Sequence, residues 1–113
     1  MKKTSIHLLL AASALLSGCA TNNTLYGWGS YEPQVYEYFK GESPEQQILV
    51  LESHLKETES KGEKIPPGFH AHLGLLYAKV GKDADFQAML AQEKRLYPES
   101  STYINNLNNK FKK

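Results

Sequence analysis

The chain has 113 residues, with 13 basic side chains, 12 acidic side chains, four histidines and one cysteine. This length suits one small domain, and the near balance of charge excludes the basic surface that nucleic-acid binding requires. A single cysteine cannot form a disulfide within the chain, so the domain is expected to gain its stability from helix packing.

The first 18 residues have the order of an export signal. Lys2 and Lys3 precede an apolar run from Ile6 to Leu16, which is too short to span a bilayer as a permanent helix. The run leads into Leu16-Ser17-Gly18-Cys19, which resembles the lipobox of bacterial lipoprotein precursors. In those proteins the cysteine receives diacylglycerol and becomes the first residue after cleavage, so residues 1–18 are predicted to be a signal peptide and Cys19 the lipidated residue. The alternative is an ordinary secreted protein with a stray cysteine near its cleavage site.

Lipid on Cys19 would hold the chain on a membrane, because each buried acyl methylene contributes about 0.8 kcal/mol. Ala20 stands where an aspartate favours inner-membrane retention in enterobacterial lipoproteins, so this resemblance implies the outer membrane, with the domain facing the periplasm. Removing residues 1–18 leaves 95 residues, with 11 basic and 12 acidic side chains and a formal charge of −1. Residues 19–24 are predicted to be the lipidated cysteine and a polar tether, and residues 25–113 the domain.

Aromatic side chains gather directly after the tether, where the only tryptophan and four of the seven tyrosines fall within residues 26–39. Pro33 and Gly41 predict a short helix over this region, ending at about Lys40. Tyrosine and tryptophan either fill a core or stack on sugars and partner proteins. A mature chain of 95 residues needs large core side chains, which favours packing of this helix on the next one. Interface residues remain the second interpretation, with Trp28 and Tyr31 at the rim of a binding surface.

Ser43-Pro44-Glu45-Gln46 predicts the start of a second helix, with Ser43 as N-cap and an end near Ser60. Its apolar side chains repeat at helical spacing and are expected to form one broad buried face: Ile48, Leu49, Val50, Leu51 and Leu55. A charged loop follows, and Pro66-Pro67 pre-sets the next helix.

Three further helices are expected. The first spans about Pro67 to Val80 and contains Gly74, where a neighbouring backbone should approach closely because mid-helix glycine costs about 1 kcal/mol. Its apolar stripe is formed by Phe69, Leu73, Leu76, Tyr77 and Val80. The next helix is capped by Asp83 or Asp85 and stops before Pro98. Ser100 or Ser101 then caps a last helix whose apolar residues are Tyr103, Ile104, Leu107 and Phe111.

A repeat signature runs through these helices. Leu73-Gly74, Tyr77, Gly81, Leu90 and Pro98 resemble the tetratricopeptide repeat (TPR), in which small and large residues let two antiparallel helices touch. Phe86 and Glu93 depart from the pattern, because the repeat has small residues at those positions. The predicted fold is therefore all-α, with about five helices in TPR-like antiparallel pairs and a terminal helix covering the end.

The lipobox, Tyr26-Gly27-Trp28-Gly29 with Tyr31-Glu32, and Tyr97-Pro98-Glu99-Ser100 together resemble a family of small proteobacterial outer-membrane lipoproteins of uncharacterised function with a TPR-like domain. Members tend to be encoded beside two other lipoproteins, one of them similar to the curli-secretion pore subunit. The resemblance thus implies a shared envelope assembly and a lipoprotein partner.

Catalytic patterns are lacking in the sequence. His70 and His72 lie two residues apart, so on a helix they point in different directions and cannot share a metal ion. Phosphate-loop, metalloprotease and hydrolase motifs are also missing, and no enzyme activity, metal or cofactor is expected.

The predicted function is an outer-membrane-anchored adaptor that binds another envelope protein. Its binding residues would lie off the apolar stripe of the helix 67–80, which selects His70, His72 and Lys79, with Trp28 and Tyr31 at the rim. The alternative is peptidoglycan or carbohydrate binding through the aromatic segment.

Overall fold

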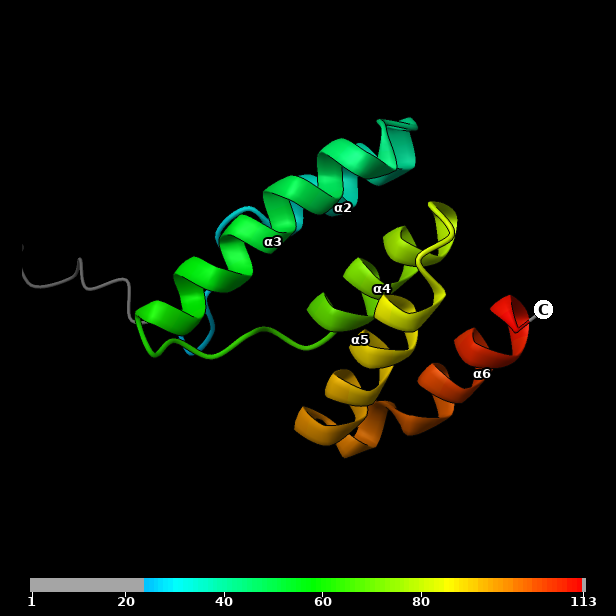
Figure 1. Cartoon of the computed structure of the whole chain (residues 1–113). Helices are drawn as coiled ribbons and strands as arrows, with labels where there is room; N and C mark the ends of the chain where they lie inside the picture. The colour runs from blue at the N-terminus through cyan, green and yellow to red at the C-terminus, as the bar shows by residue number, and fades with distance from the viewer. Residues whose placement is uncertain (1–23, 113) are drawn as a thin grey trace, which may run out of the picture.

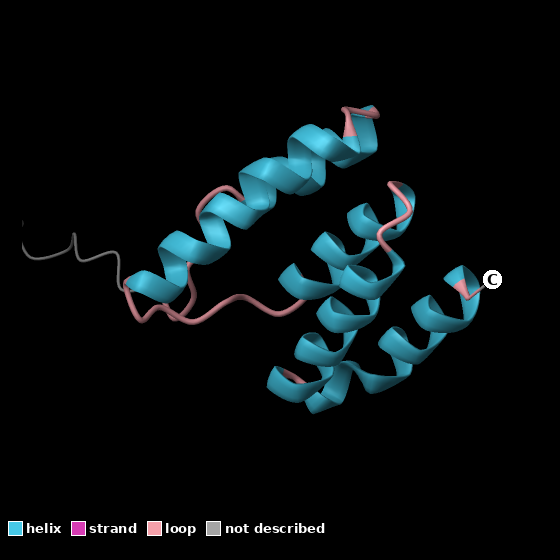
Figure 2. Cartoon of the chain, in the orientation of Figure 1, coloured by secondary structure: helices cyan, strands magenta, loops and turns pink. Residues whose placement is uncertain are grey.

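A computed structural model describes residues 24–112 of the chain (Figure 1). The predictions for the signal peptide, Cys19 and most of the tether lie outside these residues. The described part contains five α-helices, one short 3₁₀ helix and no strand beyond an isolated bridge between Tyr26 and Lys64 (Figure 2). The predicted all-α class is confirmed. The elements are α2 (Tyr31–Lys40), α3 (Pro44–Ser60), α4 (Phe69–Lys79), α5 (Asp83–Leu96), η1 (Pro98–Ser100) and α6 (Ser101–Phe111).

Each helix packs against the next one along the chain, and α4 contacts both α3 and α5. The members of the pairs α2–α3 and α4–α5 run side by side in opposite directions, with a short turn at one end of each pair (Figure 1). No helix within residues 24–112 combines the length and apolar character needed to cross a bilayer. The predicted order of antiparallel pairs is therefore present, while the TPR pairing geometry stays a prediction.

Local sequence signals explain most of the helix boundaries. The Ser43 hydroxyl accepts a hydrogen bond from the Gln46 backbone N–H at 3.4 Å, and Pro44 is the first residue of α3, as predicted. Helix α2 begins at Tyr31, so Pro33 lies in its first turn, and it ends at Lys40 with Gly41 in the left-handed conformation, as predicted.

The predicted caps of α5 and α6 are wrong. Neither Asp83 nor Asp85 caps α5, since both lie inside its first turn. There their negative charges interact favourably with the positive end of the helix dipole. Ser100 stands at the N-cap position of α6, but its hydroxyl donates to the Tyr97 carbonyl at 2.7 Å and caps no N–H group. Ser101 is the first residue of α6 and donates its hydroxyl proton to the Pro98 carbonyl at 2.5 Å.

The hydrophobic core is centred on α4. An added Cβ on Gly74 would lie 3.2 Å from the Met89 Cβ and 3.5 Å from the Phe86 carbonyl oxygen, so the predicted close approach at this glycine is confirmed. The buried apolar residues come from α3 to α6 and the loop before α4: Ile48, Leu51, Ile65, Phe69, Ala71, Leu73, Leu76, Tyr77, Phe86, Leu90 and Ile104.

The outer side of α3 differs from the prediction. Leu49 and Val50 were expected to widen its buried face, but they are 63% and 37% exposed. Ile48 and Leu51 are buried, because only the narrower stripe through these two residues faces the core.

Glu93 has a structural role that explains its departure from the repeat pattern. Its side chain is 1% exposed, and its carboxylate accepts hydrogen bonds from the backbone N–H groups of Gly68 at 2.7 Å and Ala71 at 3.3 Å. The N-cap residue of α4 is Gly68, which has no side chain to cap the helix. Glu93 of α5 therefore caps α4 from across the pair and places a negative charge at its positive end.

Candidate functional site

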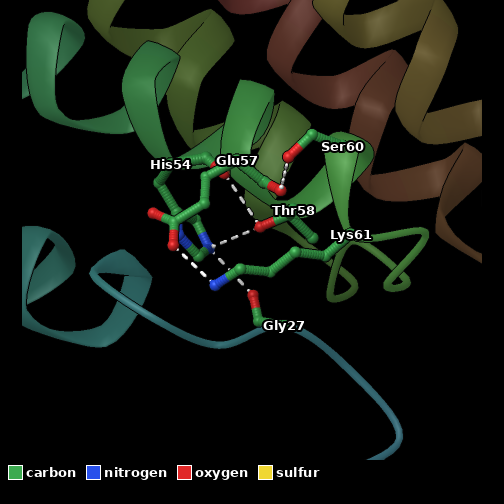
Figure 3. A network of polar contacts seen from close by, with 6 residues as sticks. All are labelled: Gly27, His54, Glu57, Thr58, Ser60 and Lys61. Carbon is green, nitrogen blue, oxygen red and sulfur yellow. Dashed lines mark hydrogen bonds and ion pairs between the residues drawn. The ribbon is translucent and has the colours of Figure 1, made fainter.

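The segment before α2 is fixed to the end of α3 (Figure 3). The Gly27 N–H donates to the Lys64 carbonyl at 2.8 Å, and the Gly27 carbonyl lies 2.8 Å from His54 Nε2. Since a carbonyl only accepts, this contact requires the proton on His54 Nε2. The Thr58 hydroxyl donates to the His54 carbonyl at 2.8 Å, so His54 is buried in a structural network.

Two glycines permit this close approach. A Cβ on Gly29, which has a φ of +38°, would lie 2.1 Å from the His54 ring. A Cβ on Gly27 would lie 2.7 Å from the Thr58 methyl carbon. Both positions therefore need glycine, and the Gly-Trp-Gly pattern holds Trp28 at a defined place beside α3.

Aromatic rings form a continuous row from the N-terminal segment to the core. Tyr26 packs edge-on against Tyr97 at 6.3 Å and against Trp28 at 6.0 Å, measured between ring centroids. Trp28 stacks on Tyr31 at 6.1 Å, and Tyr31 contacts the buried Phe69 at 5.4 Å. Trp28 keeps 36% of its surface exposed, whereas Tyr31 is half-buried. Both predicted rim residues thus contribute to packing, and Trp28 also reaches the surface.

Tyr31 connects this row to the start of α4. Its hydroxyl oxygen lies 2.8 Å from the place that a Cβ on Gly68 would take. Burial raises the pKa of Tyr31 to about 12, and the nearby charge of Glu93 and the Tyr103 hydroxyl act in the same direction. The phenol is therefore neutral at physiological pH and serves as a packing group.

His72 was selected as a partner-binding residue off the apolar stripe, but it lies buried between α2 and α4. It is 8% exposed and packs against the rings of Tyr31 at 6.0 Å and Tyr38 at 5.2 Å. Burial lowers its pKa to about 4, and the Lys79 charge adds to this effect. Helix α2 covers this side of α4, which the apolar stripe alone did not reveal.

His70, also selected as a partner-binding residue, is buried with 4% of its surface exposed, so it offers little surface to a partner. It lies near Arg95, and burial followed by the Arg95 charge lowers its pKa. The two histidines have different neighbours, as expected from their spacing. Lys79 is exposed as predicted, and its ammonium lies 4.0 Å from the centre of the Tyr38 ring.

The most exposed aromatic residues belong to α2, a helix in which no residue is buried. Phe39 is 80% exposed and Tyr36 is 62% exposed, and the Lys40 ammonium lies 4.7 Å from the centre of the Tyr36 ring. The packing interpretation of the sequence, which placed these two rings against α3, is wrong for them. Their spacing of three residues puts them on one helix face, whereas Tyr31 and Tyr38, seven residues apart, share another. This difference in helix face is the sequence signal that could have distinguished the exposed rings from the packed ones.

Metal binding has no visible basis in the described part. Within residues 24–112, no three His, Cys, Asp or Glu side chains lie close enough together to hold a metal ion.

Fold and surface define a small helical scaffold with an exposed aromatic helix. Residues 25–107 match the family described as a domain of unknown function (DUF4810), and the chain belongs to this family. The match includes the aromatic segment and α2 to α5, together with part of α6. No curated protein and no solved structure matches the chain.

Proposed function

We propose that this protein is an outer-membrane lipoprotein, anchored through lipid on Cys19, that acts as an adaptor for another envelope protein. The helix pairs serve as a rigid TPR-like scaffold and carry out no catalysis. The partner that the sequence resemblance implies is a second lipoprotein, of the kind found at the curli-secretion pore. The observation that carries the proposal is the aromatic face of α2, which the rest of the domain leaves uncovered.

This face has the composition of a protein interface. Burying a phenylalanine side chain contributes about 1.5 to 3 kcal/mol, and Phe39 is 80% exposed. Tyr36 lies on the same face and also offers a hydroxyl group, which suits the aromatic anchors that dominate binding energy. We define the α2 face as Tyr36 and Phe39, with Lys40 at its end.

Neighbouring groups extend the proposed contact area. Lys79 of α4 lies over Tyr38 of α2 and is exposed, so a cation stands beside the aromatic helix. Of the five residues selected from the sequence, Trp28 and Lys79 are exposed and stay in the proposed surface. Tyr31 and His72 pack against each other between α2 and α4, beneath that surface. His70 lies away from it, near Arg95 of α5.

Site-specific crosslinking in the living cell tests the proposal. A photoreactive amino acid at Phe39 should crosslink one envelope lipoprotein, and the same amino acid at Lys110 of α6 is the matched exposed control. A single product at position 39, absent at position 110, supports the adaptor. The same products at both positions, or none at position 39, would contradict it.

Carbohydrate binding is the second candidate, because the Trp28 ring is partly exposed and stacked on Tyr31 at 6.1 Å. A ring held in this way can present one edge or face to a sugar. Sedimentation with purified murein separates the two functions. Binding to murein that is lost in Trp28→Ala, without any crosslink at position 39, would favour the carbohydrate candidate.

A further inference from the structure

A cleft of about 600 Å³ is lined by residues of α3, α4 and α5, by the loop after α3, and by Tyr26 and Tyr97. It is separate from the α2 face, since no residue of α2 lines it. Its volume falls in the range of about 300 to 1,000 Å³ that is usual for small-ligand sites. Apolar side chains contribute part of the lining, namely those of Leu55, Ile65, Met89 and Leu96.

Charged residues of both signs line the same cleft. Glu59 and Glu63 come from the end of α3 and the following loop, and Lys64 and Arg95 come from that loop and from α5. None of these four forms an ion pair within residues 24–112, where the only two salt bridges are Lys40–Glu37 and Lys61–Glu57. The Arg95 guanidinium instead donates to the Gln92 side-chain oxygen at 2.8 and 3.0 Å, which holds it in place without neutralising it.

His70 supplies a second, independent sign of a binding site. It lines the cleft, it is 4% exposed, and its Nδ1 has no hydrogen-bond partner among the described residues. A buried polar nitrogen without a partner costs about 1 to 3 kcal/mol, so proteins retain few of them. The wall of the cleft therefore includes a residue whose polar nitrogen the fold itself leaves unsatisfied.

We propose that this cleft binds a short peptide with free ends and apolar side chains. Its carboxylate contacts Arg95 and Lys64, its ammonium contacts Glu59 and Glu63, and its side chains lie on Leu55, Met89 and Leu96. The presence of both charge signs selects a zwitterion over a purely anionic or purely apolar ligand. A short peptide is favoured over a protein terminus, because a terminus carries only one of the two charges.

Isothermal titration of the full-length chain with trileucine is the direct test. Trileucine should bind, and trileucine with an acetylated amine and an amidated carboxylate should bind at least about tenfold more weakly, as expected for a lost charge-assisted contact. Triglycine should bind more weakly too, since it lacks the apolar side chains. Free leucine shows whether one residue suffices or a peptide is required, and tighter binding of trileucine is the expected result.

Variants locate the site. Arg95→Gln and Glu63→Gln should each weaken trileucine binding by about tenfold, and both residues are exposed, so the fold should tolerate the changes. Lys110→Gln on α6 is the matched control and should leave binding unchanged.

The methyl signals of Leu55 and Met89 should shift on titration in NMR spectra, whereas that of Ile104 should stay in place. The proposal is overturned if trileucine does not bind, if capping both ends leaves its affinity unchanged, or if the control variant weakens binding as much as Arg95→Gln.

Discussion

Replacement of Glu93 tests how α4 is held at the centre of the fold. The carboxylate is 1% exposed and accepts the N–H groups of Gly68 and Ala71 at the start of α4. Glu93→Ala removes both acceptors and leaves the buried Ala71 N–H and the partly buried Gly68 N–H without these partners. Glu93→Gln keeps the size of the side chain and one acceptor oxygen, but it removes the negative charge that interacts favourably with the positive end of the α4 dipole.

The expected losses follow from these contacts. The orphaned buried N–H of Ala71 costs about 1 to 3 kcal/mol, and the lost Gly68 bond and the emptied space of the buried side chain add to this, so Glu93→Ala should lower the free energy of unfolding by about 3 kcal/mol or more. Glu93→Gln should cost about 1 to 2 kcal/mol, because one hydrogen bond and the charge are lost. Glu99→Ala, an exposed change in η1, is the matched control and should stay within about 0.5 kcal/mol.

Urea unfolding followed by circular dichroism measures these differences. With a dependence on urea of about 1 to 3 kcal/mol/M, a loss of 3 kcal/mol lowers the midpoint by about 1 to 3 M. If Glu93→Ala unfolds at the midpoint of Glu99→Ala, Glu93 does not cap α4, and the explanation for its burial is wrong.

Three further predictions concern the core, pH dependence and the anchor. Leu73→Ala should lower the free energy of unfolding by about 2 to 5 kcal/mol in urea, because Leu73 is fully buried; a change below about 0.5 kcal/mol would place it outside the core. His72 has a folded pKa of about 4, below the usual value of 6.5, so its contribution is present above pH 6.5 and is lost as the pH falls to 4, by up to about 3 kcal/mol. His72→Phe should flatten that part of the stability profile, and an unchanged profile would refute the assignment. Cys19→Ser should abolish labelling with radioactive palmitate, and a labelled, membrane-bound variant would contradict the lipobox assignment.

The sequence predicted those features of the fold that depend on neighbouring residues. Ser43 and Pro44 define the start of α3 because a cap acts within one helical turn. Gly74 indicated a close helix contact for two reasons. Glycine is unfavourable inside a helix, and the repeat pattern has a small residue where two antiparallel helices touch. The breadth of the buried face on α3 could not be predicted, since Leu49 and Val50 have the same apolar character as their buried neighbours.

The candidate site depended on contacts between distant residues, which single-sequence patterns do not contain. Glu93 acts on an N–H group 25 positions earlier in the chain, and His54 binds a carbonyl 27 positions earlier. His70 and His72 were selected because they lie off the apolar stripe of α4, but α4 is the central helix and is covered on several sides. Stripe arguments assume one buried face, and a central helix breaks that assumption.

The claim that the α2 face binds a partner is tested most directly with the double variant Tyr36→Ala/Phe39→Ala. Its affinity for the lipoprotein crosslinked through position 39 and its thermal midpoint should be measured together. Both rings are largely exposed, so the midpoint should stay within about 2 °C of the parent chain. Binding should weaken by about 2 kcal/mol or more, which is roughly thirtyfold in the dissociation constant. Unchanged affinity, or a midpoint that falls by several degrees, would contradict the assignment of α2 as the binding surface.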